Sequence, residues 1–220
     1  MRTIRGLGLL IVAALVGVAA ADDRGTDLEV PGSIFANGEG LLAKYDYFVG
    51  KVLLKDSHYA PHVRMLVRPS WCCEWMVEIE KPTGDTAIVR YVVANRSIWH
   101  GAKPRATSVT TLERTVDAAT AGSLRDAWMH MLERTTPRQP AVGFDGATYL
   151  FMAFVQGRGN IEGEVWSPPN DSPTGRLVGL GTMLRDYVSV DSRPTVTSEA
   201  LRQAAETLVA ERSMDRDSKP

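Results

Sequence analysis

The residues most suggestive of chemistry are two adjacent cysteines, Cys72 and Cys73, which lie between Trp71 and Trp75. In an oxidising compartment, neighbouring cysteines can form a vicinal disulfide, which would make this turn redox-sensitive or suited to contact a ligand. Alternatively, the two side chains point to opposite faces at the start of a strand, because free cysteine is commonly buried as a small apolar residue. We favour the second interpretation, since the usual redox motif separates its cysteines by two residues.

Tryptophans form the second group of candidates. Trp71, Trp99 and Trp166 are expected at strand ends beside turns. If the sheet brings these ends together, the aromatic side chains would form a recognition surface for a protein or a saccharide, because tryptophan is enriched at binding hot spots. Filling of the core edge is the competing interpretation, and we slightly favour it. The candidate binding residues are therefore Trp71, Cys72, Cys73, Trp99 and Trp166.

A metal site could use Asp56, His58 and His62, because carboxylate and imidazole ligands suit zinc or copper. Pro61 lies between the two histidines and disrupts the helical face that would bring them together. Recognised zinc spacings are absent from the sequence. We therefore predict no metal site and no cofactor, and we expect these histidines to be solvated loop residues.

Four glutamates occupy alternate positions of two predicted strands: Glu78, Glu80, Glu162 and Glu164. Carboxylates on one sheet face could perform general acid–base catalysis. Any solvated strand face has the same spacing, and we favour that simpler interpretation. The Gly-x-Ser-x-Gly motif of serine hydrolases is absent. The remaining covalent option combines Cys72 or Cys73 with a distant histidine and these carboxylates.

Residues 1–21 have the layout of a signal peptide, with Arg2 and Arg5 before an uncharged apolar run over 6–18. Small residues permit cleavage after Ala21 or, alternatively, after Ala20. The apolar run of roughly 15 residues is shorter than the about 20 that a membrane-spanning helix needs. We expect a periplasmic or secreted protein with no stable membrane insertion after cleavage.

The overall charge is nearly balanced, with 25 Lys+Arg against 26 Asp+Glu among 220 residues, and a formal net charge of −1. Nucleic-acid binders usually carry a strongly basic surface, so we expect no nucleic-acid partner. The hydrophobic and charged fractions of 44% and 23% are typical of a globular protein. Two cysteines are too few for a fold that depends on a disulfide framework.

Hydrophobic periodicity divides the rest of the chain into strands and helices. A period of two predicts strands over about 63–67, 75–79, 86–94, 109–116, 149–155 and 161–166. Helical spacing predicts helices over about 40–53, 117–134, 174–188 and 198–211. These elements indicate an α+β fold, an antiparallel sheet of about five to seven strands with helices packed on one face. We expect a flexible arm over 22–39, a single domain over 40–212 and a disordered tail over 213–220.

None of the catalytic or metal patterns is better supported than its simpler structural interpretation. We therefore expect an exported, non-enzymatic protein that binds another macromolecule, most simply a protein partner in the cell envelope or outside the cell, as an inhibitor does. The alternative is an envelope hydrolase with an assembled cysteine, histidine and carboxylate site.

Overall fold

The computed structural model describes residues 27–31, 41–100, 107–137, 145–189 and 196–217. Its strands are β1 (Val63–Pro69), β2 (Trp75–Ile79), β3 (Thr86–Ala94), β4 (Val109–Asp117), β5 (Ala147–Val155) and β6 (Gly159–Trp166). Its helices are α1 (Leu41–Leu53), α2 (Ala118–Leu132), α3 (Pro173–Val188) and α4 (Ser198–Asp217).

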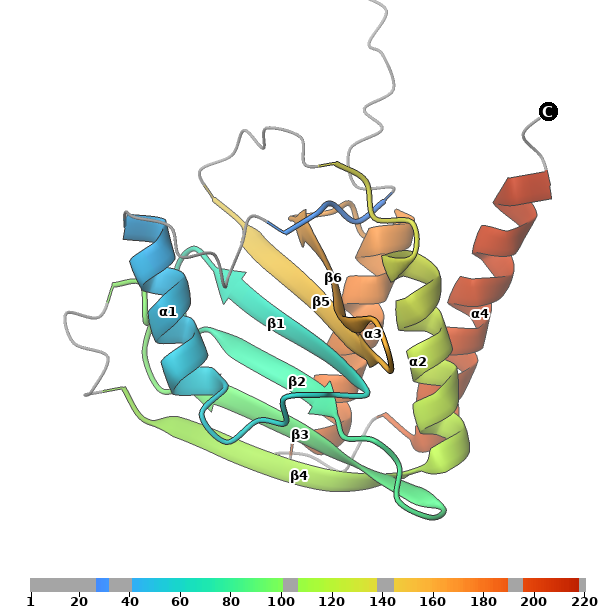
Figure 1. The fold of residues 1–220 in the computed structure, drawn as a ribbon, viewed down its shortest axis with the longest axis horizontal. Helices are drawn as coiled ribbons and strands as arrows, with labels where there is room; N and C mark the ends of the chain where they lie inside the picture. Colours follow the sequence, from blue (N-terminus) through green and yellow to red (C-terminus); the bar gives the residue numbers. More distant parts are fainter. Residues whose placement is uncertain (1–26, 32–40, 101–106, 138–144, 190–195, 218–220) are drawn as a thin grey trace, which may run out of the picture.

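The six strands form one antiparallel sheet in the order β4-β3-β2-β1-β5-β6 (Figure 1). Neighbouring strands β1 to β4 follow one another along the chain, and α2 then carries the chain across the sheet to β5. The predicted α+β class and the antiparallel sheet are confirmed.

Helices α2 and α3 begin at side chains that accept hydrogen bonds from unpaired backbone N–H groups. The carboxylate of Asp117 accepts from the N–H of Thr120 at the start of α2. The hydroxyl of Ser172 accepts from the N–H of Gly175 at the start of α3. Proline is favoured in the first turn, so α3 begins at Pro173, one residue before the start that we predicted from Thr174.

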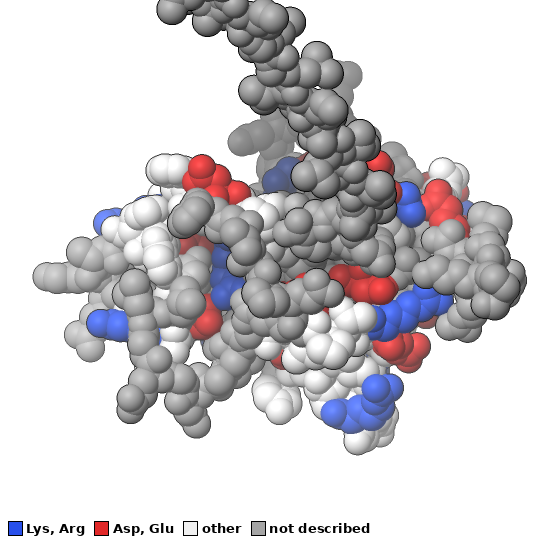
Figure 2. Space-filling view, turned by 90° about the horizontal axis from the view of Figure 1, so that it is seen from above, with Lys and Arg blue, Asp and Glu red and all other residues white. Residues whose placement is uncertain are grey.

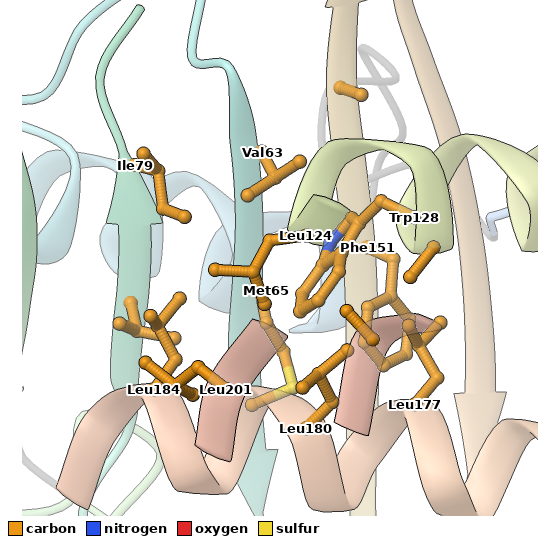
Figure 3. Packing of buried hydrophobic residues seen from close by; sticks show 14 of the residues in the cluster. Val63, Met65, Ile79, Leu124, Trp128, Phe151, Leu177, Leu180, Leu184 and Leu201 are labelled. Carbon is orange, nitrogen blue, oxygen red and sulfur yellow. The ribbon is translucent and has the colours of Figure 1, made fainter. Parts of the chain in front are cut away.

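The main hydrophobic core lies between one face of the sheet and the helices α2, α3 and α4 (Figure 3). Trp128 of α2 packs edge to face on Phe151 of β5, with ring centroids 5.8 Å apart. Leucines of α3 and α4, including Leu180 and Leu201, surround this pair. Burying each such side chain contributes roughly 1.5–3 kcal/mol to folding.

Helix α1 packs on the opposite face of the sheet from the other three helices. Its residues Val49 and Leu53 contact a second buried cluster that includes Leu66, Met76 and Leu150. These three strand residues alternate with residues that face the main core, because successive side chains of a strand point to opposite sides. The helices we expected on one face are thus divided three to one.

The structure also places parts of the expected arm and tail. Within the predicted arm over 22–39, residues 27–31 are packed against β6: Leu28 is fully buried, and Glu29 exchanges two backbone hydrogen bonds of 2.8 Å with Glu164. Helix α4 continues through the first five residues of the predicted tail, to Asp217. The predicted signal peptide over 1–21 lies outside the described residues.

Candidate functional site

The sheet topology brings the candidate tryptophans to one end of the sheet. Strands β1, β3 and β6 end there, and β2, β4 and β5 begin there, because adjacent strands are antiparallel (upper left of Figure 1). Trp71 follows β1, Trp99 follows β3, and Trp166 is the last residue of β6. We call the surface formed by Trp71, Cys72, Cys73, Trp99 and Trp166 the tryptophan end.

The three indole rings at the tryptophan end are accessible to different degrees. Trp71 is 74% exposed, whereas Trp99 and Trp166 are 39% and 37% exposed. Among the described residues, no ring contact joins these three tryptophans to one another. They therefore form separate contact points around one end of the sheet. Trp71 does not fill the edge of the core, because most of its surface is exposed.

Cys72 and Cys73 are joined by a disulfide. The interpretation we favoured, two unlinked side chains on opposite strand faces, is therefore wrong, because the pair lies in the connection between β1 and β2, before the strand begins. Cys72 is exposed and Cys73 is half-buried. In this bonded form neither cysteine offers the thiolate that nucleophilic catalysis requires.

Glu74, directly after the disulfide, is fully buried and ties three parts of the chain together. Its carboxylate accepts hydrogen bonds from the hydroxyl of Tyr45 on α1, at 2.8 Å, and from the backbone N–H groups of Ile98 and Trp99, at 2.7 and 3.1 Å. Its backbone carbonyl accepts from the N–H of Ala94 at 2.9 Å. Glu74 thus fixes the β1–β2 connection to both α1 and the β3–β4 connection.

Tyr45 completes this arrangement beneath Trp99. The two rings meet edge to face, with centroids 4.9 Å apart. Burial, reinforced by the neighbouring carboxylate of Glu74, raises the pKa of the Tyr45 hydroxyl well above its ordinary value. The hydroxyl therefore stays protonated and keeps donating to Glu74. This pair was not predictable from the sequence, because Tyr45 and Glu74 are 29 residues apart and no local pattern relates them.

A second set of contacts holds the same connection to β5. The hydroxyl of Ser70 donates to the carbonyl of Gly146 at 2.9 Å and accepts from its N–H at 3.1 Å. The carbonyl of Ser70 also lies 3.2 Å from Nε2 of His100. Gly146 packs closely on Trp166, since a Cβ at this position would lie 2.9 Å from the indole ring. Hydrogen bonds and close packing therefore hold the segments that carry the candidate residues in fixed positions relative to one another.

The four glutamates that we assigned to a solvated face line the α1 side of the sheet. Glu78 is fully buried and lies in a row of opposite charges at paired register positions, Arg64, Glu78, Arg90 and Glu113. Arg64 donates to Glu78 at 2.9 and 2.7 Å, and Arg90 lies 3.2 Å from Glu78 and 2.7 Å from Glu113. The solvated-face interpretation is wrong for Glu78.

The remaining carboxylates on this face are also largely withdrawn from water. Arg68 lies 2.6 Å from Asp46 of α1 and 3.3 Å from Glu164, and both acids are buried. Glu80 pairs with Arg90 at 2.7 Å. Burial raises the pKa of the half-buried Glu162 carboxyl, although Arg64 lowers it in part. Apart from Glu162, the glutamates stand in ion pairs, which indicates a structural role.

The residues that we considered as metal ligands and rejected, Asp56, His58 and His62, do not converge. Nε2 of His58 lies 3.0 Å from Glu80, and His62 lies in a separate pocket on the far side of Pro61. In the described ranges, no group of three or more histidine, cysteine, aspartate or glutamate side chains could hold a metal ion. None of the described helices is both long enough and apolar enough to cross a membrane.

The surface charge of the described residues is mixed. Figure 2 shows acidic and basic side chains interspersed, with no broad patch of either sign on the face in view. Comparisons with protein-family models, with curated proteins and with solved structures found no match to this chain. A functional proposal therefore rests on the residues and contacts described above.

Proposed function

We propose that this chain is an exported, non-enzymatic protein that binds a protein partner in the cell envelope or outside the cell through the tryptophan end. The observation that carries the proposal is the convergence of three tryptophans onto one end of the sheet: Trp71 from the β1–β2 connection, Trp99 from the β3–β4 connection and Trp166 from the end of β6. Of these, Trp71 is 74% exposed. Tryptophan is enriched among the residues that dominate binding energy at protein interfaces.

The contacts beneath this surface suit binding by a preorganised site. Glu74 fixes the β1–β2 connection through three hydrogen bonds, and Ser70 fixes it to Gly146. The disulfide between Cys72 and Cys73 further restricts the residues beside Trp71. Because little freedom remains to be lost on association, a rigid surface of this kind loses less affinity to ordering.

Export is supported by two independent features. The sequence of residues 1–21 has a charged start followed by an apolar run and small residues, as signal peptides do. Disulfides persist mainly in oxidising compartments, so the bond between Cys72 and Cys73 suits the periplasm or the exterior. The same bond removes the thiolate of the alternative hydrolase site, and we do not propose that activity.

The test is affinity capture from envelope extract with residues 22–220 as bait, comparing Trp71→Ala with Tyr59→Ala. Tyr59 is a matched control, because it is 85% exposed and lies in the connection before β1, at the opposite end of the sheet. We expect a retained partner whose affinity falls at least about tenfold in Trp71→Ala and is unchanged in Tyr59→Ala. Failure to retain a protein, equal losses in both variants, or hydrolysis of an envelope polymer would overturn the proposal.

A further inference from the structure

A pocket of about 270 Å³ lies at the end of the sheet opposite to the tryptophan end. Its lining includes His62 before β1, Lys81 after β2, Arg125 of α2, and Phe154 and Gln156 around the end of β5. Four separate segments therefore meet at this pocket. Nothing in the proposed function uses it.

Arg125 is held in place by uncharged partners. Its two terminal nitrogens donate to the backbone carbonyls of His62 and Phe154, each at 2.8 Å. These carbonyls orient the guanidinium without neutralising its charge. A guanidinium has five N–H donors, so further donors remain available to a ligand.

The pocket carries positive charge without a balancing carboxylate. Its lining contains no aspartate or glutamate. Within the described ranges, neither Arg125 nor Lys81 takes part in an ion pair. Two cations facing one small cavity attract an anion, and their attraction is strongest for a divalent one.

The pKa of His62 depends on the positive charges in this pocket. Its Nε2 atom is buried without a hydrogen-bond partner, and the ring makes a hydrogen bond with the backbone of Ala121. Burial, followed by the positive charges of Arg125 and Lys81, lowers the pKa of His62 to about 4. The imidazole is therefore neutral at pH 7.

We propose that this pocket binds a phosphate group, either as inorganic phosphate or as the end of a small phosphate ester. Near neutral pH, a phosphate ester is largely a dianion and inorganic phosphate is a mixture of the monoanion and the dianion, so both carry the negative charge that Arg125 and Lys81 attract. The planar guanidinium fork also suits phosphate oxygens. A volume of about 270 Å³ holds a phosphate with a few attached atoms.

Binding of this anion is coupled to protonation of His62. A phosphate between Arg125 and Lys81 offsets the positive charges that oppose protonation of the imidazole, so the pKa of His62 rises toward its ordinary value of about 6.5. Reciprocity requires that protonated His62 in turn strengthens phosphate binding. Lys81 from the β2–β3 connection and Arg125 from α2 are the charged groups that act on His62.

The test follows the histidine ring resonances by NMR during pH titrations of residues 22–220, with and without inorganic phosphate. We expect phosphate to raise the pKa of His62 by at least one unit, whereas the ring resonances of His100, at the tryptophan end, should not respond to phosphate. Calorimetry then compares phosphate, glycerol phosphate and acetate. If the natural ligand is a phosphate ester, glycerol phosphate should bind more tightly than inorganic phosphate. If the natural ligand is inorganic phosphate, glycerol phosphate should bind no more tightly than inorganic phosphate. In both cases acetate should bind more weakly than the two phosphate compounds.

Lys81→Gln is the informative variant, because this exposed side chain can be changed without disturbing the fold. We expect it to weaken phosphate binding about tenfold, since it removes one charge-assisted contact. Lys51→Gln, a lysine of α1 outside this pocket, should bind as the unmodified chain does. An unchanged His62 titration, equal binding of acetate, or equal losses in the two lysine variants would overturn the proposal.

Discussion

Glu74 is the residue whose replacement most directly tests the frame of the tryptophan end. In Glu74→Gln the side chain keeps its shape, and its remaining oxygen can still accept from Tyr45 and Trp99 at the Oε1 position. The amide nitrogen then replaces Oε2, which accepts from the N–H of Ile98 at 2.7 Å. Two hydrogen-bond donors thus face each other in a fully buried place.

The expected loss of stability follows from those contacts. Ile98 is 5% exposed and Glu74 is fully buried, so neither unpaired donor can be satisfied by water. Leaving a buried donor unpaired costs about 1–3 kcal/mol, and we expect a decrease of about 2–4 kcal/mol in the free energy of unfolding. Urea denaturation followed by circular dichroism measures it as a lower midpoint at unchanged slope.

The matched control is Glu113→Gln, because it makes the same substitution at a glutamate whose side chain is 48% exposed and pairs with Arg90. Exposed ion pairs contribute about 0–1 kcal/mol, so this variant should remain close to the unmodified protein. A loss in Glu74→Gln no larger than that in Glu113→Gln would refute the assignment of Glu74 as the buried anchor of the tryptophan end.

Three further variants test other parts of the fold. Leu28→Ala removes a fully buried side chain at the edge of the sheet, so we expect the free energy of unfolding to fall by about 2–5 kcal/mol in urea denaturation. Asp117→Ala removes the cap that accepts from the N–H of Thr120 and should cost about 1–2 kcal/mol at pH 7; because the folded pKa of Asp117 is lowered to about 2, this difference should shrink as the pH falls from about 4 to 2. Above about pH 10 the unmodified protein should lose stability, because Tyr45 ionises in the unfolded chain before it ionises in the folded protein, where its pKa is raised. Tyr45→Phe lacks this hydroxyl, so its free energy of unfolding should fall less over the same pH range.

The fold was largely accessible from periodicity. Strand β3 is rich in β-branched residues and β5 is apolar on both faces, so both are recognisable as strands, and α2 begins directly after Asp117, which the sequence marks as a helix cap. The position of α1 was not accessible. Its apolar residues predict a helix with one buried face, but they do not specify which side of a sheet with two apolar faces receives it.

The positions of the tryptophans in the candidate site were predictable from the sequence, but the disulfide and the hydrogen bonds that hold the site were not. The three tryptophans follow directly from strand boundaries, because antiparallel neighbours bring their turns to common ends. The adjacent cysteines were compatible with a disulfide and with separate side chains, and only the geometry of the turn decides between them. The partners of Glu74 come from α1 and from the β3–β4 connection, and such long-range contacts leave no local pattern.

The spacing of the glutamates did not reveal whether their sheet face is exposed to solvent or covered by a helix. Glu78 and Glu80 alternate in the same way whether the sheet face is bare or covered. The additional signal was present in the strands on either side of β2, where Arg64 and Arg68 lie on one face of β1 and Arg90 lies on β3. Opposite charges at facing positions stabilise a covered face by pairing, whereas a bare face requires no such match.

The docking of residues 27–31 against β6 has a consequence for how the chain is made. Leu28 is synthesised early, but Thr136 and Glu164, whose backbones bond this segment, follow it by more than 100 residues. Until then β6 does not exist, and Leu28 has no burial site. Docking of this segment therefore requires β6 to form first, and until the segment docks the edge of the sheet is open to pairing with other chains.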